Sequence, residues 1–180
     1  MPVVHCSQKL LKRLRLPPEI DPAAGRNPLG DWCADIDFID RHPFVLVMNV
    51  ATAVTLVLPA RAADLKQLHV MAGQQLVGLL AACGIDNALG QAELCAWRSP
   101  PTFVRNHNRS LAASLSRRKQ DAWMQFAHGD QTAFEVALRL LETPFSRKDL
   151  GRDFHFAVDL LRKRLDSPAR AARGPSDTLH

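Results

Sequence analysis

The sequence predicts an α+β fold: a small, mainly antiparallel sheet packed by helices, with a helical C-terminal extension. Three observations support this prediction. Short runs rich in β-branched residues occupy residues 32–58 and are separated by turns. Apolar residues then recur at helical spacing over residues 64–83 and again in the last third of the chain. The 180 residues are 47% apolar and 23% charged, the balance of a globular protein rather than of a disordered one.

Three consecutive strands are expected between Trp32 and Leu58. Residues 32–39 alternate, so their apolar and acidic side chains point to opposite faces. Residues 44–48 and 54–58 are apolar on both faces, and their short links favour an antiparallel meander that helices must cover. Residues 44–60 are apolar enough to suggest a membrane helix, but 17 residues are at the lower limit for one. The many valines fit two strands better, so no membrane association is expected.

Helices are expected where apolar periodicity follows a capping residue. Asp64 is a candidate N-cap for a helix that ends near Cys83, with Gly84 as its left-handed C-terminal cap. Ser7 and Asn108 are candidate N-caps for two more helices. The remaining elements are a β-like run at 3–6, a helix at 87–95, an extended piece at 102–105, a helix around 134–141 and a helix from Asp149 to Leu165.

The chain divides into three parts by its pattern. Residues 1–125 form the predicted α+β core domain, and residues 126–165 form the helical extension. Residues 166–180 are rich in Pro, Ala and Arg without an apolar stripe, which predicts a disordered tail.

Basic residues are concentrated in the second half of the chain. The net charge of the whole sequence is +5, yet residues 1–97 carry −1 and residues 98–180 carry +6. Such a basic half is typical of a protein that binds nucleic acid or an acidic protein, although it also serves solubility alone.

The strongest candidate site is a cluster of basic and polar residues around a predicted helix start. Free backbone N–H groups at a helix N-terminus attract anions, and arginine forms bidentate bonds with phosphate. The alternative is a solvated helix face with an Asn cap. The anion-binding candidates are Arg105, His107, Asn108, Arg109, Ser110, Arg117, Arg118 and Lys119.

Two weaker candidates involve cysteine. Cys33, Asp35 and Asp37 share one strand face, where they are suited to sharing a proton or binding a divalent ion, but a solvated strand face is the more common outcome. His5 and Cys6 are adjacent in a strand and therefore point to opposite faces, which disfavours a thiolate–imidazole pair. No metal site and no cofactor are predicted, because the sequence has no zinc-ligand spacing and no nucleotide-binding glycine motif. Without a secretion signal, four reduced cysteines in a cytoplasm are expected.

Several short motifs resemble one bacterial family. They are residues 5–11 (HCSQKLL), 28–34 (PLGDWCA), 49–52 (NVAT) and 108–111 (NRSL). In this order and spacing they resemble DUF6933, a domain of unknown function, over roughly residues 1–125. Members of that family usually carry His after the tryptophan, where this chain has Cys33. The resemblance implies a small α+β bacterial domain and brings no established activity with it.

The sequence therefore predicts a binding module for nucleic acid or another polyanion, acting through its basic second half. Two alternatives stay open. One is a small ribonuclease-like hydrolase, with His107 as acid/base and Arg105 and Arg109 holding phosphate. The other is an interaction protein without catalytic activity. Neither the enzyme question nor the oligomeric state is decided by the sequence.

Overall fold

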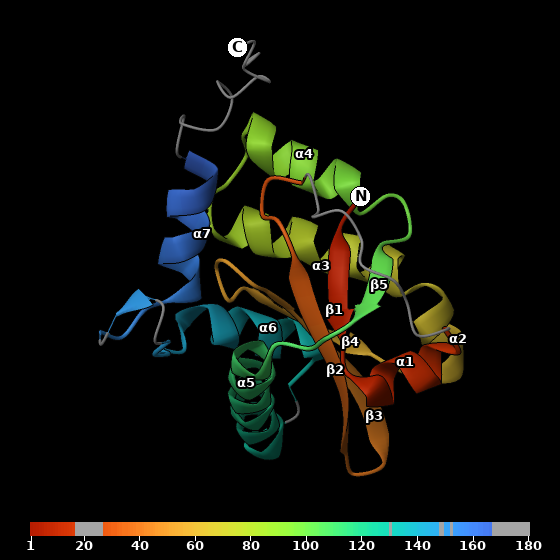
Figure 1. Cartoon of the computed structure of the whole chain (residues 1–180). Helices are drawn as coiled ribbons and strands as arrows, with labels where there is room; N and C mark the ends of the chain where they lie inside the picture. The colour runs from red at the N-terminus through yellow and green to blue at the C-terminus, as the bar shows by residue number, and fades with distance from the viewer. Residues whose placement is uncertain (17–26, 130, 148–149, 152, 167–180) are drawn as a thin grey trace, which may run out of the picture.

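A five-stranded mixed sheet forms the centre of the computed structural model, in the order β4-β3-β2-β1-β5 (Figure 1). The structure describes residues 1–16, 27–129, 131–147, 150–151 and 153–166. The strands are β1 (Val3–Cys6), β2 (Trp32–Ile39), β3 (His42–Asn49), β4 (Thr55–Pro59) and β5 (Thr102–Arg105). The helices are α1 (Gln8–Leu14), α2 (Ala62–Lys66), α3 (Leu68–Ala82), α4 (Ala88–Ala96), α5 (Arg109–Ala127), α6 (Ala133–Glu142) and α7 (Ala157–Asp166).

The α+β class and the antiparallel meander are confirmed, but the sheet as a whole is mixed. Strands β2, β3 and β4 pair antiparallel through short turns. Strand β1 instead pairs parallel with both of its neighbours, β2 and β5. The reason lies in the connections: α1 and a long segment separate β1 from β2, and a parallel neighbour requires such a long crossover.

The two faces of the sheet carry different helices. Register places Cys33 and Asp35 on one face of β2 and Trp32 and Ala34 on the other. Helix α5 packs on the Asp35 face against β2 and β3. Helix α4 covers the Trp32 face and packs beside α3, so the sheet lies between helices, as Figure 1 shows.

Of the three predicted N-caps, Ser7 and Asn108 are confirmed, and Asn87 caps a further helix start. The side chains of Ser7, Asn87 and Asn108 accept backbone N–H groups at the starts of α1, α4 and α5. The prediction of a single helix that starts at Asp64 is wrong. The chain forms α2 and α3 with a break at Gln67, and Asp64 lies inside α2, where its carboxylate accepts the backbone N–H of Arg61 at 2.9 Å. Gly84 has φ +69°, as a left-handed C-terminal cap requires.

The C-terminal helices pack into the same apolar core as the sheet. Helix α6 contacts β4, α3 and α5, and buries Val136 and Leu140. The helix expected from Asp149 to Leu165 begins only at Ala157. The division into a core domain and an extension stays a prediction. The predicted disordered tail lies outside the described residues except for Asp166, which ends α7.

Strand β4 is at one edge of the sheet, and a side chain from α3 covers part of that edge. The carboxamide of Gln75 accepts the backbone N–H of Val57 at 2.6 Å and donates to the carbonyl of the same residue at 2.8 Å. This pair of bonds reproduces the pattern that a neighbouring strand would make.

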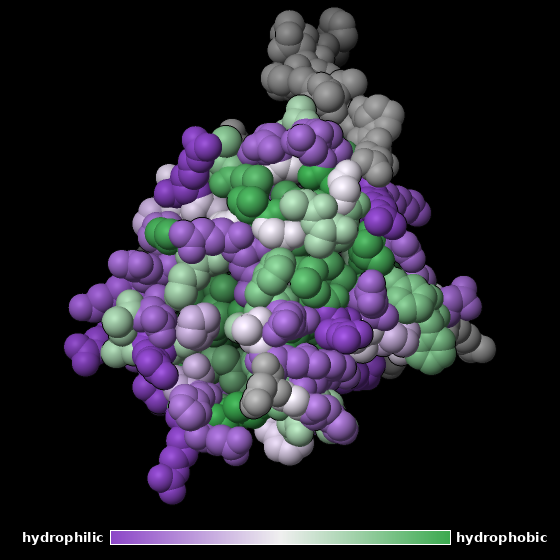
Figure 2. Space-filling view, turned by 180° about the vertical axis from the view of Figure 1, so that it is seen from behind, coloured by the Kyte–Doolittle hydropathy of each residue, from purple (hydrophilic) through white to green (hydrophobic). Residues whose placement is uncertain are grey.

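The part of the chain that the structure describes contains no helix with the length and apolar character to cross a membrane. The apolar stretch at residues 44–60 forms β3, a turn and β4, as predicted. Seen from behind, the molecule shows apolar side chains grouped within a hydrophilic surround (Figure 2).

Candidate anion site

A cleft of about 310 Å³ lies between α5, the turn linking β3 to β4, and the segment after α6. Three arginines line it, Arg117 and Arg118 of α5 and Arg147 of the later segment, and we call it the arginine cleft. Its apolar lining includes Met48, Phe145 and Phe154. The cleft thus combines cationic donors with an apolar wall, which suits a ligand that has both an anionic and an apolar part.

Arg118 is the most unusual residue of this cleft. Its side chain is only 3% exposed, although it carries a guanidinium. Nη1 donates to the carbonyl of Thr143 at 3.2 Å and lies 3.6 Å from Oδ2 of Asp121, while the guanidinium carbon lies 4.6 Å from the Phe145 ring centroid. Nε and Nη2 are buried without a hydrogen-bond partner among the described residues. Burial lowers the pKa of Arg118, against the opposing effect of Asp121.

The other charged groups of the cleft surround Arg118. Arg117, which directly precedes Arg118 on α5, is exposed. Arg147 reaches across from the segment after α6 and donates to the carbonyl of Val50. Asp121 supplies the negative charge, and burial raises the pKa of its carboxyl group. Three arginines against one carboxylate leave the cleft positive, as an anion site requires.

The predicted cluster at the start of α5 is separate from this cleft. Arg105, His107 and Arg109 are exposed, with Arg105 ending β5 and Arg109 opening α5. The side chain of Asn108 is occupied as N-cap, accepting from the backbone N–H groups of Ser110 at 2.9 Å and Leu111 at 3.2 Å. Arg109 and Arg117 are eight positions apart on α5, about 12 Å along the axis. Of the eight candidates, only Arg117 and Arg118 therefore meet in the cleft.

Lys119 faces the opposite charge rather than a ligand. Its ammonium lies 2.6 Å from Oδ2 of Asp35 and 3.3 Å from Oδ2 of Asp37. The Ser7 hydroxyl donates to the other oxygen of Asp35. Burial lowers the pKa of Lys119, but its bonds to the two carboxylates have the larger combined effect, so its pKa is raised. The acidic strand face and part of the basic helix thus neutralise each other, and the described residues contain no group of three metal ligands.

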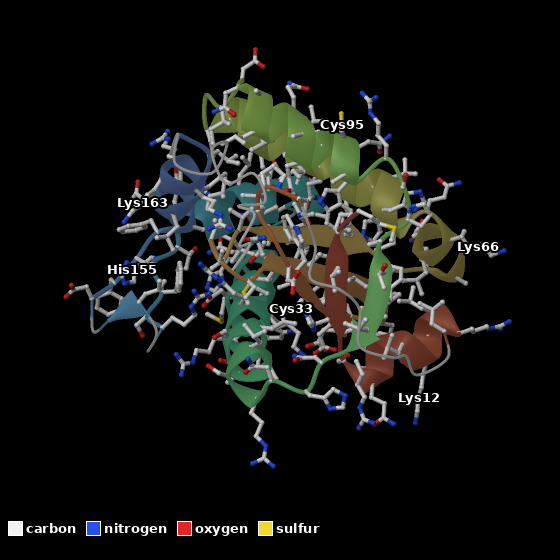
Figure 3. The ribbon with its side chains drawn as sticks, turned by 45° about the horizontal axis from the view of Figure 1, so that its top comes forward. Lys12, Cys33, Lys66, Cys95, His155 and Lys163 are labelled. Carbon is white, nitrogen blue, oxygen red and sulfur yellow. The ribbon has the colours of Figure 1, made fainter. Side chains whose placement is uncertain are left out.

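The cysteines of β1 and β2 are enclosed. Cys6 and Cys33 are 0% exposed, and Cys33 lies towards the middle of the molecule while Lys12 and Lys66 project from its periphery (Figure 3). Burial raises the pKa of the Cys6 thiol far above its usual value, and that of Cys33 to about 12 despite nearby Arg147. His5 turns away from Cys6 and lies 3.0 Å from Oδ2 of Asp31. Neither thiol is suited to act as a nucleophile.

A buried carboxylate in α4 is the second unusual group of the molecule. Glu93 is 0% exposed and accepts hydrogen bonds from the side chain of Asn27, at 2.8 and 3.0 Å, and the backbone N–H of Leu29, at 2.9 Å. The indole N–H groups of Trp32 and Trp97 also donate to it, at 3.3 and 3.2 Å. Burial raises its pKa, while these hydrogen bonds act in the opposite direction. Glu93 therefore holds the segment before β2 to α4.

A family comparison agrees with the motifs. The model of the family described as Domain of unknown function (DUF6933) matches residues 3–158 of the chain. The chain belongs to the DUF6933 family. The match extends past residue 125, where the resemblance was expected to end, and includes α6, the start of α7 and every residue of the arginine cleft. A search of curated proteins found none that matches.

Two of the DUF6933 motifs meet in space. Asn49 of the NVAT motif donates to the carbonyls of Leu29 at 3.1 Å and Asp31 at 3.2 Å, both in the PLGDWCA motif. Its side-chain oxygen accepts the backbone N–H and the hydroxyl of Thr52, each at 2.9 Å. These motifs therefore fix the turn that forms one wall of the arginine cleft, because Ala53, with φ +57°, follows directly.

The members of the site that the sequence did not indicate include Asp121, Phe145, Arg147 and Phe154. One signal for Arg118 was present, since it falls on the same helical stripe as Leu115 and Ala122, where an apolar residue is expected. A charged residue in such a stripe departs from binary patterning, and such departures concentrate at functional positions. No comparable signal identified Arg147, because only the fold brings it to α5.

Proposed function

We propose that this protein binds an anionic ligand and holds the anion in the arginine cleft. The observation that carries the proposal is the buried Arg118, with Nε and Nη2 unsatisfied among the described residues. Leaving a buried charged donor without an acceptor costs about 1–3 kcal/mol or more. Both nitrogens are closed to solvent, so a phosphate or carboxylate in the cleft would supply the missing acceptors after the Arg118 side chain turns towards it.

The composition of the cleft favours phosphate as the anion. Arg117 and Arg147 line the same cavity as Arg118, and planar guanidinium groups match phosphate oxygens with paired hydrogen bonds. This proposal keeps the predicted class of partner, nucleic acid or another polyanion, and changes the residues that hold it. The exposed Arg105 and Arg109 lie outside the cleft, at the end of β5 and the start of α5, and are left with a steering role.

Binding is better supported than hydrolysis. The predicted hydrolase needs His107 next to the phosphate-holding arginines, within about 3 Å of the reacting group or one water away. His107 precedes α5, whereas Arg117 and Arg118 lie more than two turns into that helix. Lys119 and Asp35, the other acid–base pair on α5 and β2, already bond to each other.

Thermal unfolding in the presence of phosphate tests the proposal. A ligand at 100 times its Kd stabilises the native state by about 2.7 kcal/mol, which for a chain of this size raises the Tm by about 5–10 °C. Phosphate should raise the Tm, while sodium chloride of the same ionic strength should not. Arg118→Met should abolish the rise. Arg109→Ala, on the same helix but outside the cleft, is the matched control and should keep it.

Equal Tm values in phosphate and chloride would contradict the proposal and favour an interaction protein whose charge serves solubility. A rise that Arg109→Ala removes and Arg118→Met leaves intact would move the anion to the start of α5.

A further inference from the structure

We propose that the ligand of the arginine cleft is a nucleotide, whose phosphate is held by the arginines and whose base stacks on Phe154. This inference rests on the proposed function and names its ligand. Three properties of the cleft carry it: an exposed aromatic ring, a carboxylate beside the guanidinium groups, and the volume of the cavity.

Phe154 is the aromatic group offered to a ligand. It lines the cleft and is 74% exposed, although it belongs to a segment that is otherwise anchored by the pairing of Phe145 with His155. An exposed phenylalanine forgoes about 1.5–3 kcal/mol of burial. Every nucleobase has a flat face that stacks on such a ring. Phe145 is less available, because the Arg118 guanidinium lies over its ring at 4.6 Å and His155 packs 6.2 Å away.

Asp121 is suited to accept hydrogen bonds from the ribose or the base of a nucleotide. Its carboxylate lines the cleft and is 36% exposed, so that part of it faces the cavity. A carboxylate repels phosphate but accepts hydrogen bonds from a ribose hydroxyl or an exocyclic amino group. Inorganic phosphate alone would leave this acceptor and the apolar wall unused. A nucleotide carries an anion, donors and an aromatic plane on one molecule.

The cavity limits the ligand to one nucleotide. About 310 Å³ is at the lower end of the range for small-molecule pockets, too small for a duplex. The same nucleotide chemistry occurs in a free mononucleotide and at the phosphorylated end of a single strand. A 5′-phosphorylated oligonucleotide and adenosine 5′-monophosphate therefore serve as separate probes.

Isothermal titration calorimetry at constant ionic strength tests the inference with four probes: inorganic phosphate, adenosine, adenosine 5′-monophosphate and a 5′-phosphorylated oligoadenylate. Stacking of one base on one ring contributes at least about a fivefold gain in affinity. We expect the monophosphate to bind at least fivefold more tightly than inorganic phosphate, and adenosine to bind more weakly than the monophosphate. Tighter binding of the oligonucleotide than of the monophosphate would identify the end of a strand as the source, and the reverse order a free nucleotide.

Two variants distinguish stacking of the base from binding of the phosphate. Phe154→Ala should reduce monophosphate affinity to that of inorganic phosphate and leave phosphate affinity unchanged. Phe156→Ala is the matched control, because this phenylalanine is also exposed but is not part of the cleft lining. Both substitutions are at exposed positions, so both variants should fold.

The outcomes distinguish failure of the ligand class from failure of anion binding. Equal affinity for the monophosphate and inorganic phosphate, with Arg118-dependent binding of both, overturns the nucleotide inference and leaves anion binding intact. An unchanged monophosphate affinity in Phe154→Ala also overturns it. Absence of phosphate binding to the wild-type protein overturns both.

Discussion

The ammonium group of Lys119 lies 2.6 Å from Oδ2 of Asp35, across the contact between α5 and β2. This pair joins two features that the sequence offers as separate sites, an acidic strand face and a basic helix. Because each side chain is less than 20% exposed, the charges meet in a partly desolvated layer. Their role is to seat α5 on the sheet, and α5 in turn presents Arg117 and Arg118 to the cleft.

Lys119→Met should lower the free energy of unfolding by about 1–2 kcal/mol, because Asp35 and Asp37 then lose their shared counter-charge. The folded-state pKa of Lys119 is raised above its ordinary value of 10.5. The stabilisation is therefore complete below pH 10.5 and is lost as the pH rises through the folded-state pKa. Urea unfolding of both proteins across this range measures the difference. Lys66→Met, at an exposed position of α2, is the control, and an equal loss in that variant would reject the ion pair as the cause.

Arg118→Met should raise the free energy of unfolding by about 1 kcal/mol in the absence of ligand. An apolar side chain of similar length removes a buried charge with two unsatisfied donors, and water can solvate the remaining carboxylate of Asp121, which is 36% exposed. The exposed Arg117→Met should change stability by less than about 0.5 kcal/mol. Denaturant titration in phosphate-free buffer measures both. A loss of more than about 1 kcal/mol in Arg118→Met would mean that its bond to Thr143 and its contact with Phe145 are structural supports.

Glu93→Ala should cost about 3–5 kcal/mol, because it leaves the N–H groups of Leu29, Trp32 and Trp97 buried without their acceptor. Glu93→Gln keeps the shape and one acceptor oxygen, and should cost less. Near-ultraviolet circular dichroism should also lose part of its tryptophan signal in the alanine variant, since the two indole rings are held edge to face at 5.3 Å. Stability within about 0.5 kcal/mol of wild type would show that water replaces the carboxylate.

One of the four thiols should react quickly with a thiol reagent in the native protein. Cys95 is exposed, whereas Cys6, Cys33 and Cys83 are buried. Burial raises the pKa of all three buried thiols, to about 12 for Cys33, so their thiolate fraction near neutral pH is negligible. Ellman's reagent should titrate one thiol at once and all four after unfolding, and Cys95→Ser should remove the fast phase. Two or more fast thiols would show that the fold opens locally around a buried cysteine.

Much of the fold was predictable because local patterns decide it. The meander was predicted from the alternation over residues 32–39 and from the valine-rich runs that follow, with small errors in the strand ends. Such local patterns suffice because each of these strands pairs with its neighbour in the sequence. The parallel pairing of β1 was not predictable from its four residues, because its partners lie about 30 and 100 positions away. The break at Gln67 was missed because the apolar periodicity continues through it.

For the arginine cleft, only the positive charge was predictable from the sequence. The basic half of the chain supplies all three arginines of the cleft, but proximity in sequence grouped Arg117 with Arg105, which lies in β5 outside the cleft. Burial separated Arg118 from Lys119, although the two are adjacent: one turns towards Thr143 and the other towards Asp35. Sequence spacing shows which face of a helix a residue occupies, while the partner of that face depends on tertiary packing.

The side-chain amide of Gln75 on the edge of β4 has a consequence for how copies of this protein behave at high concentration. An open edge strand recruits strands from other molecules and begins their aggregation. By bonding both backbone groups of Val57, Gln75 occupies a position at which an incoming chain would otherwise attach. Gln75→Leu would leave that position vacant with little change to the apolar surface of α3. Crowded solutions of that variant are therefore expected to form cross-β assemblies sooner than wild type.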